Sequence, residues 1–201
     1  MKLKKNSKAL VIVAHPDDET IWMGGLIMRN PQVEWMIMST CRASDTDRAP
    51  KFARVCAVYK AHALIEDMDD EGKWAFQKNV RETKKVLLKH FAGKQFDYLF
   101  THGMNGEYGH PVHKVVHEAV YDLIRREKIK ANEVYFFNYK KKYRRPFSEM
   151  IIRNNSDVLV PLTKSELMKK KEIVSKMHGY PMDGIDVSLC MNPEAFRKMK
   201  K

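Results

Sequence analysis

The stretch ALVIVA at Ala9–Ala14, followed at once by HPDDE at His15–Glu19, determines the expected fold of this chain. The first part is a short apolar run rich in β-branched residues, which is typical of a strand buried on both faces of a parallel sheet. The run is far too short to span a bilayer. The second part places one imidazole and three carboxylates directly after the strand. The pattern therefore predicts a buried strand that carries polar side chains to the edge of a sheet.

Strand-like and helix-like segments alternate along the rest of the chain. The further predicted strands are Val33–Thr40, Phe96–Thr101, Glu133–Asn138 and Asp157–Pro161. The predicted helices are Ile21–Met28, Ala53–Leu64, Lys78–Phe91, Val112–Ile124 and Lys164–His178. Such alternation predicts an α/β fold with a mostly parallel sheet and helices on both of its faces. Because ligands bind at the carboxyl ends of parallel strands, the loops His15–Glu19, Cys41–Pro50 and His102–His113 should share one edge.

Composition adds few constraints. The chain has 201 residues and a formal net charge of +12, and no linker or repeat divides it, so one domain over residues 1–201 is expected. The segment KKKYRR at Lys140–Arg145 is the best candidate for nucleic-acid binding, but the charge is scattered, which favours solvated loops. The basic start lacks a cleavage site, and the three cysteines are widely spaced. A cytoplasmic protein without a membrane span is therefore expected.

The cluster at His15–Glu19 cannot be buried without a cation or other partners, because buried charges are costly. Zinc accepts both nitrogen and oxygen ligands, so a mixed set of histidine and carboxylate suits it. The alternative is structural: Asp17, Asp18 and Glu19 would also interact favourably with the positive end of a following helix.

The loop His102–His113 favours the metal interpretation. It contains three histidines, a tyrosine and three glycines, and Pro111 is well placed to open a helix. His15, Asp18 and His113 would supply three ligands and leave one position for water, the pattern of a catalytic zinc site. His117, one helical turn after His113, is a rival ligand that we rank behind it. Ferrous iron is the alternative metal, since sites of this composition accept either ion.

Together, AHPDDE at Ala14–Glu19 and GEYGHPVH at Gly106–His113 resemble the two motifs of the LmbE-like, or PIG-L-type, family of zinc-dependent N-deacetylases. The first segment matches completely and the second in seven of eight positions. The resemblance extends from about Ala9 to Val120 and implies a Rossmann-like three-layer fold. Both motifs are long and correctly ordered, so the resemblance is specific.

The resemblance also implies functional roles. The implied zinc ligands are His15, Asp18 and His113. The other implied roles are Asp17 as general base, His110 as the residue that assists the tetrahedral intermediate or protonates the leaving amine, Tyr108 as a group that polarises the acyl oxygen, and Arg48 as a substrate contact. Members remove an acyl group, usually acetyl, from an amino sugar or sugar conjugate, and related small members often form symmetric assemblies.

The chain departs from the family pattern at two places. Val112 stands where the family has an Asp thought to orient and charge the assisting histidine. His178-Gly179-Tyr180 stands where many members have Ser-Gln after a histidine. Metal-dependent hydrolysis of a non-sugar amide is therefore an alternative, and nucleic-acid binding is a weaker one. We expect Arg48, His102 and His178 near the pocket.

Overall fold

The strand predicted at Ala9–Ala14 lies at the centre of a sheet in the computed structural model, which describes residues 1–143 and 149–200. This sheet has seven strands in the order β3-β2-β1-β4-β5-β9-β8. Their bounds are β1 (Lys8–Val13), β2 (Glu34–Ser39), β3 (His62–Ile65), β4 (Gln95–Thr101), β5 (Lys130–Phe137), β8 (Val158–Val160) and β9 (Glu194–Lys198). A separate hairpin joins β6 (Tyr139–Lys141) to β7 (Met150–Ile152).

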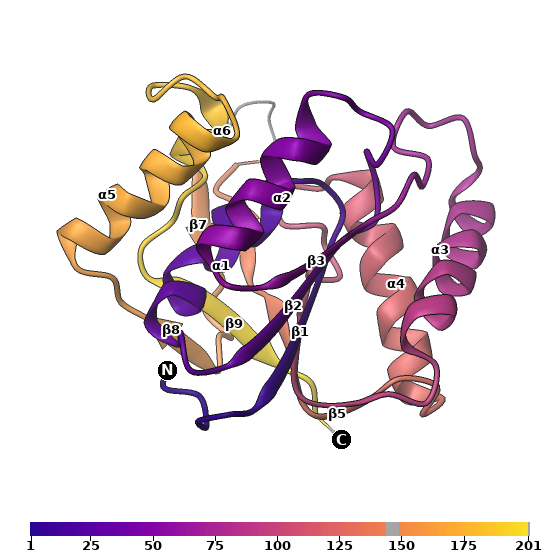
Figure 1. Cartoon of the computed structure of the whole chain (residues 1–201). Helices are drawn as coiled ribbons and strands as arrows, with labels where there is room; N and C mark the ends of the chain where they lie inside the picture. The colour runs from indigo at the N-terminus through magenta and orange to yellow at the C-terminus, as the bar shows by residue number, and fades with distance from the viewer. Residues whose placement is uncertain (144–148, 201) are drawn as a thin grey trace.

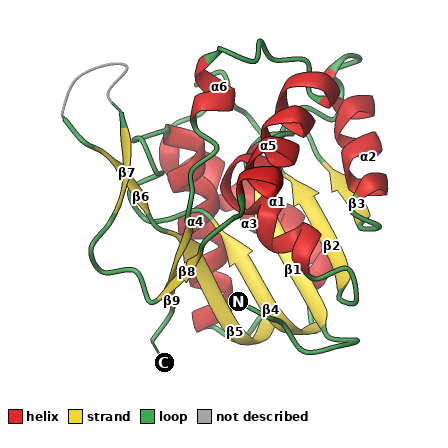
Figure 2. Ribbon diagram, turned by 90° about the vertical axis from the view of Figure 1, so that its left-hand side faces the viewer, coloured by secondary structure: helices red, strands yellow, loops and turns green. Residues whose placement is uncertain are grey.

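The first five strands of this order run parallel to one another, with Val11 opposite Ile37 on β2 and Phe100 on β4. Only β9 and β8 add antiparallel pairs, at the far side of β5. The predicted α/β fold with a mostly parallel sheet is thus confirmed. The carboxyl ends of β1, β2 and β4 meet at one edge, which brings the loops after them together (Figure 2).

Helices cover both faces of the sheet (Figures 1 and 2). The helices are α1 (Asp18–Arg29), α2 (Arg48–Val58), α3 (Phe76–Phe91), α4 (Pro111–Arg125), α5 (Lys164–Glu172) and α6 (Ile185–Ser188), with a π-helical turn at Ile173–Met177. Side chains alternate along β1, so Val11 joins the core under α1 and α2, while Leu10 joins the core under α3 and α4. Two apolar cores on opposite faces explain why the whole of β1 is apolar.

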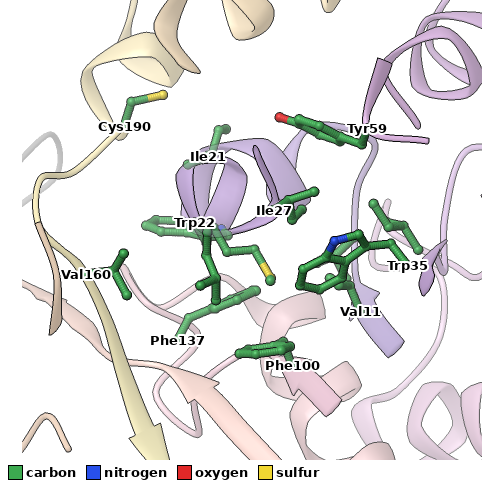
Figure 3. Packing of buried hydrophobic residues seen from close by; sticks show 14 of the residues in the cluster. Val11, Ile21, Trp22, Ile27, Trp35, Tyr59, Phe100, Phe137, Val160 and Cys190 are labelled. Carbon is green, nitrogen blue, oxygen red and sulfur yellow. The ribbon is translucent and has the colours of Figure 1, made fainter. Parts of the chain in front are cut away.

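The core under α1 is dominated by aromatic residues (Figure 3). Trp22 on α1 is fully buried, and its ring lies 6.4 Å from that of Phe137 on β5. Trp35 on β2 packs against Phe100 at 6.1 Å. Fully burying one large apolar side chain contributes about 1.5–3 kcal/mol, so this cluster strongly fixes α1 on the sheet.

Helix α1 is kinked, and the C-terminal part of the chain stabilises the kink. Met23 has non-helical backbone angles, so the helix effectively restarts after it. The Glu194 carboxylate accepts hydrogen bonds from the Gly25 and Leu26 N–H groups, both at 2.8 Å, and Lys170 pairs with it at 2.7 Å. Free N–H groups at a helix start need acceptors, and Glu194 supplies them. Strand β9 and helix α5 therefore hold in place the helix that begins at Asp18.

Some sequence predictions were wrong in detail. The helix predicted over Ala53–Leu64 ends at Val58, and His62–Ile65 forms β3 instead, with Ala63 opposite Ile37. The apolar residues of this short strand continue the helical spacing, so periodicity alone did not separate the two elements. Strand β9 and the β6–β7 hairpin were not predicted.

Among the described residues, no helix combines the length and apolarity needed to cross a membrane. The basic segment Lys140–Arg145 is only partly visible, because Arg144 and Arg145 lie outside the described residues. Of its visible members, Lys142 pairs with Glu149 at 2.9 Å.

Candidate active site

A small pocket opens where the loops after β1, β2 and β4 meet. Its volume is about 240 Å³. Of the seven residues to which the resemblance assigns roles, six line it, namely His15, Asp17, Asp18, Arg48, Tyr108 and His110. The seventh, His113, is fully buried behind them, with its ring 4.5 Å from that of His110. Segments far apart in the sequence therefore form one site at the predicted edge.

Asp18 lies close to both of the other predicted metal ligands. Asp18 Oδ2 lies 3.4 Å from His15 Nδ1 and 3.5 Å from His113 Nε2. Tetrahedral zinc bonds of about 2.0–2.2 Å would separate neighbouring ligand atoms by about 3.3–3.6 Å. Among the described residues, His113 Nε2 is the one buried side-chain nitrogen or oxygen without a hydrogen-bond partner. An orphaned imidazole nitrogen that faces a carboxylate fits a missing cation.

His102 competes with this assignment. Its Nε2 also lies 3.5 Å from Asp18 Oδ2, and its ring stacks on that of His113 at 3.9 Å. However, His102 Nε2 already accepts the Ala14 backbone N–H at 3.0 Å. Its lone pair is engaged, whereas that of His113 is not. Among the described residues, the groups whose ligand atoms all lie within 4.8 Å of one another are His15 with His110 and His113, His15 with Cys41 and Asp70, and Asp18 with His102 and His113. The predicted set combines members of the first and third groups.

Glu107 connects the two buried histidines. Its Oε2 accepts from His113 Nδ1 at 2.6 Å and from His102 Nδ1 at 2.9 Å, and its Oε1 accepts the Gly103 N–H at 2.7 Å. With the hydrogen on Nδ1, the Nε2 lone pair of His113 is directed at Asp18. Burial would raise the pKa of Glu107, but the two imidazoles lower it to about 2. Carboxylates in this position orient ligand histidines and increase their basicity.

Asp17 is buried but is not directed at the histidines. Its Oδ2 accepts Arg48 Nη2 at 2.9 Å and also the Tyr180 hydroxyl. Its φ of 139° lies in a region that side chains other than glycine rarely adopt, and such strain is common at functional sites. Burial and the adjacent Asp18 charge raise the pKa of Asp17 to about 6. A carboxylate with this pKa is well suited to accept a proton near neutral pH.

Asp18 has different surroundings. The Trp22 indole donates to its Oδ1 at 2.9 Å, and the His15 backbone N–H donates to its Oδ2 at the same distance. Burial would raise the pKa of Asp18, but His113 and His102 lower it well below its ordinary value. Asp18 therefore stays ionised, as a ligand must. The two adjacent carboxylates have opposite pKa shifts, which is typical of groups with separate tasks.

His110 caps α4. Its Nδ1 accepts the Val112 N–H at 3.3 Å, so the hydrogen of the neutral ring is on Nε2. Burial and the neighbouring histidines lower the pKa of His110 to about 3. Val112 stands where a carboxylate was expected, and the nearby Asp18 charge opposes the shift only in part. Tyr108 is half-buried, with its ring 5.7 Å from that of His110.

The remaining predicted residues also have clear positions. His117 is buried and donates from Nδ1 to the His102 carbonyl at 2.9 Å, so it does not join the ligand atoms. His178 is buried beneath the site, with Nε2 3.2 Å from Glu19 Oε1. Both His102 and His178 lie behind the pocket wall and are absent from its lining.

The sequence did not single out three further features. Glu107 was not assigned a role, although a ligand histidine generally needs an acceptor at its second nitrogen. Arg42 also lines the pocket and pairs with Asp70 at 2.6 Å, and Asp70 lies 3.6 Å from His15 Nε2. Tyr180 reaches the site from a distant segment, and only the departure from the family pattern at that position indicated it.

One family model matches more than half of this chain. The model of the PIG-L family, described as GlcNAc-PI de-N-acetylase, matches residues 10–124. An uncharacterized protein of Acanthamoeba polyphaga mimivirus is 26% identical over 133 residues. That alignment covers 57% of this chain and 56% of the relative, so the chain matches little more than half of its length.

Two solved structures share the fold. The antimicrobial reagent A40926 pseudoaglycone deacetylase Dbv21 has a TM-score of 0.64 and 12% identity, over 91% of this chain and 89% of that one. The 4-carboxy-2-hydroxymuconate hydratase GalB from Pseudomonas putida KT2440 has a TM-score of 0.55 and 18% identity, over 86% and 79%. At these identities, the two structures support the fold only.

Proposed function

Because the chain belongs to the PIG-L, or GlcNAc-PI de-N-acetylase, family, we propose that residues 1–201 act as a metal-dependent deacetylase domain. The proposed reaction is hydrolysis of an amide that joins an acyl group, most simply acetyl, to an amino sugar or glycoconjugate. The orphaned Nε2 of His113, directed at Asp18 Oδ2 at 3.5 Å, is the observation that carries this proposal.

The proposed metal ligands are His15 Nδ1, Asp18 Oδ2 and His113 Nε2. Zinc is the preferred ion, and ferrous iron is the alternative. When bound, zinc lowers the pKa of a coordinated water to about 7 and polarises a carbonyl oxygen. Glu107 and Trp22 hold two of the ligands in place through the hydrogen bonds described above.

Asp17 is the proposed general base. It lines the pocket, and the pKa of about 6 lets it accept a proton from the attacking water and pass that proton to the departing amine. His110, neutral over the physiological range, is suited to donate its Nε2–H to the oxygen that becomes negative. The resemblance allowed two roles for His110, and its environment favours this one over protonation of the amine.

The surroundings of the pocket are consistent with a polar, compact substrate. Arg48 and Tyr108 present hydrogen-bond donors, and Trp22 and Leu189 supply apolar contacts. A volume of about 240 Å³ accommodates a group of the size of one sugar ring. A non-sugar amide with several hydrogen-bonding groups is the alternative substrate, because Tyr180 occupies a position at which the chain departs from the family.

The test is release of free amine from a panel of N-acetylated sugars and non-sugar amides by zinc-reconstituted protein. Asp17→Asn serves as the control, since it should retain the metal but not the base. We expect release from at least one N-acetylated sugar by the wild type and a loss of at least about 100-fold in the variant. If no amide is hydrolysed by fully metal-loaded protein, the proposed activity is wrong.

A further inference from the structure

The segment that follows the π-helical turn holds the strand-to-helix loop at two points. Gly179 has φ of +90°, and this reversal lets the two side chains beside it turn toward the site. His178 contacts Glu19, whose Oε2 accepts the Asp17 backbone N–H at 3.0 Å. Tyr180 contacts the Asp17 side chain directly. One short segment therefore restrains both the backbone and the carboxylate of Asp17.

The two donors to Asp17 act on the same oxygen. Arg48 Nη2 donates to Oδ2 at 2.9 Å, and the Tyr180 hydroxyl donates to Oδ2 as well. Among residues 1–143 and 149–200, no side chain or backbone group donates to Oδ1. Arg48 also donates to the Pro16 carbonyl at 3.2 Å, which ties the guanidinium to the same loop. The carboxylate is thus fixed with one oxygen engaged and the other open.

We propose that Tyr180 is a positioning residue for Asp17, holding Oδ2 so that Oδ1 alone is available to accept the proton of the attacking water. This inference rests on the proposed function. Tyr180 lies outside the segment matched by the family model, which ends at residue 124. The C-terminal part of the chain would therefore complete the catalytic base, and the departure at His178-Gly179-Tyr180 would be a functional feature of this protein.

Two other roles for Tyr180 predict different results. A tyrosine that only binds substrate would affect KM, since its hydroxyl would contribute equally in ground and transition states. A tyrosine that only fills the pocket wall would be replaced by phenylalanine without consequence, because the ring is retained. A positioning role predicts a loss in kcat with KM and metal content unchanged.

The experiment compares wild type, Tyr180→Phe and the control Tyr98→Phe. Tyr98 is on β4, and its hydroxyl accepts the Lys4 backbone N–H. We expect Tyr180→Phe to lower kcat by about 10- to 100-fold, with KM within about twofold and one metal per chain. Tyr98→Phe should match the wild type. Unchanged kcat, or a raised KM with unchanged kcat, would overturn the proposal.

A second readout needs no activity. Thermal unfolding of the metal-free protein is measured for Tyr180→Phe, Asp17→Asn and the double variant. Residues in contact have non-additive effects, so the change in stability of the double variant should differ clearly from the sum of the two single changes. Additive changes would refute the contact. If the wild type hydrolyses no amide, the proposed function fails, and this cycle alone decides whether Tyr180 restrains Asp17.

Discussion

Replacement of Glu107 by glutamine should weaken metal binding although Glu107 is not a ligand. The glutamate side chain is fully buried and accepts three hydrogen bonds, from His113, His102 and Gly103. A glutamine has one acceptor oxygen and one donor amide. If its oxygen faces the histidines, the amide meets the Gly103 N–H, and two donors oppose each other. If the amide faces the histidines, His113 must move its hydrogen to Nε2, the atom that should bind the metal.

The size of this effect follows from both cases. Loss of a hydrogen bond that involves a charged partner costs about 1.5–3 kcal/mol. Loss of the carboxylate behind a ligand histidine typically lowers metal affinity by about 10- to 100-fold, or about 1.4–2.7 kcal/mol. We therefore expect the zinc dissociation constant of Glu107→Gln to be about 10- to 100-fold above that of the wild type.

The assay is competition for zinc between metal-free protein and a chelating indicator. Glu118→Gln, at an exposed position on α4, is the matched control and should bind zinc like the wild type. Glu107→Asp keeps the charge and should show a smaller loss. If Glu107→Gln binds zinc within twofold of the wild type, Glu107 does not set the tautomer of a metal ligand, and the reasoning is wrong.

Four further outcomes are expected. Asp17→Asn should retain zinc and lose most of kcat, whereas Asp18→Asn should lose zinc and regain part of its activity in excess zinc, as metal analysis and rate measurements will show. His117→Ala should keep its metal, because its ring faces the His102 carbonyl. In metal-free protein, the pKa of Asp17 is about 6, above the ordinary value of 3.8. Between these pH values the native state therefore binds more protons than the unfolded state, and the free energy of unfolding falls as pH rises. Denaturant titrations from pH 4 to 7 should show this fall, of up to about 3 kcal/mol in the free energy of unfolding, for the wild type but not for Asp17→Asn. Gly25→Ala should lower the free energy of unfolding by about 1–3 kcal/mol, since its Cβ would lie 2.4 Å from Leu162 Cδ2.

The fold and the centre of the site were predictable because the residues that determine them lie in short, continuous stretches of sequence. Strand β1 is apolar because both of its faces are buried, and the same physical requirement makes it recognisable in the sequence. His15 and Asp18 follow β1, His113 lies at the start of the helix after β4, and neighbouring parallel strands bring their ends together. Their assignment as metal ligands stays a prediction, although Asp18 lies within 3.5 Å of both histidines.

Contacts between distant segments were not predictable in the same way. Glu107 orients His102 and His113, and it can do so only because the Nδ1 atoms of both rings face its carboxylate. Tyr180 reaches Asp17 through a reversal at Gly179 that periodicity does not reveal. Strand β3 has only four residues and follows α2 closely, so its local pattern resembled a continued helix. In each case, tertiary packing determined the outcome.

The most direct test of the metal assignment is an anomalous difference map from a crystal grown with zinc. Among the described residues, His15 and His113 each belong to two of the groups that could hold a metal, and Asp18 belongs to one, so the position of the ion distinguishes the predicted set from these groups. We predict one peak within about 2.0–2.2 Å of His15 Nδ1, Asp18 Oδ2 and His113 Nε2. A peak bound by His102 in place of His15, or one between Cys41 and Asp70, would contradict the account.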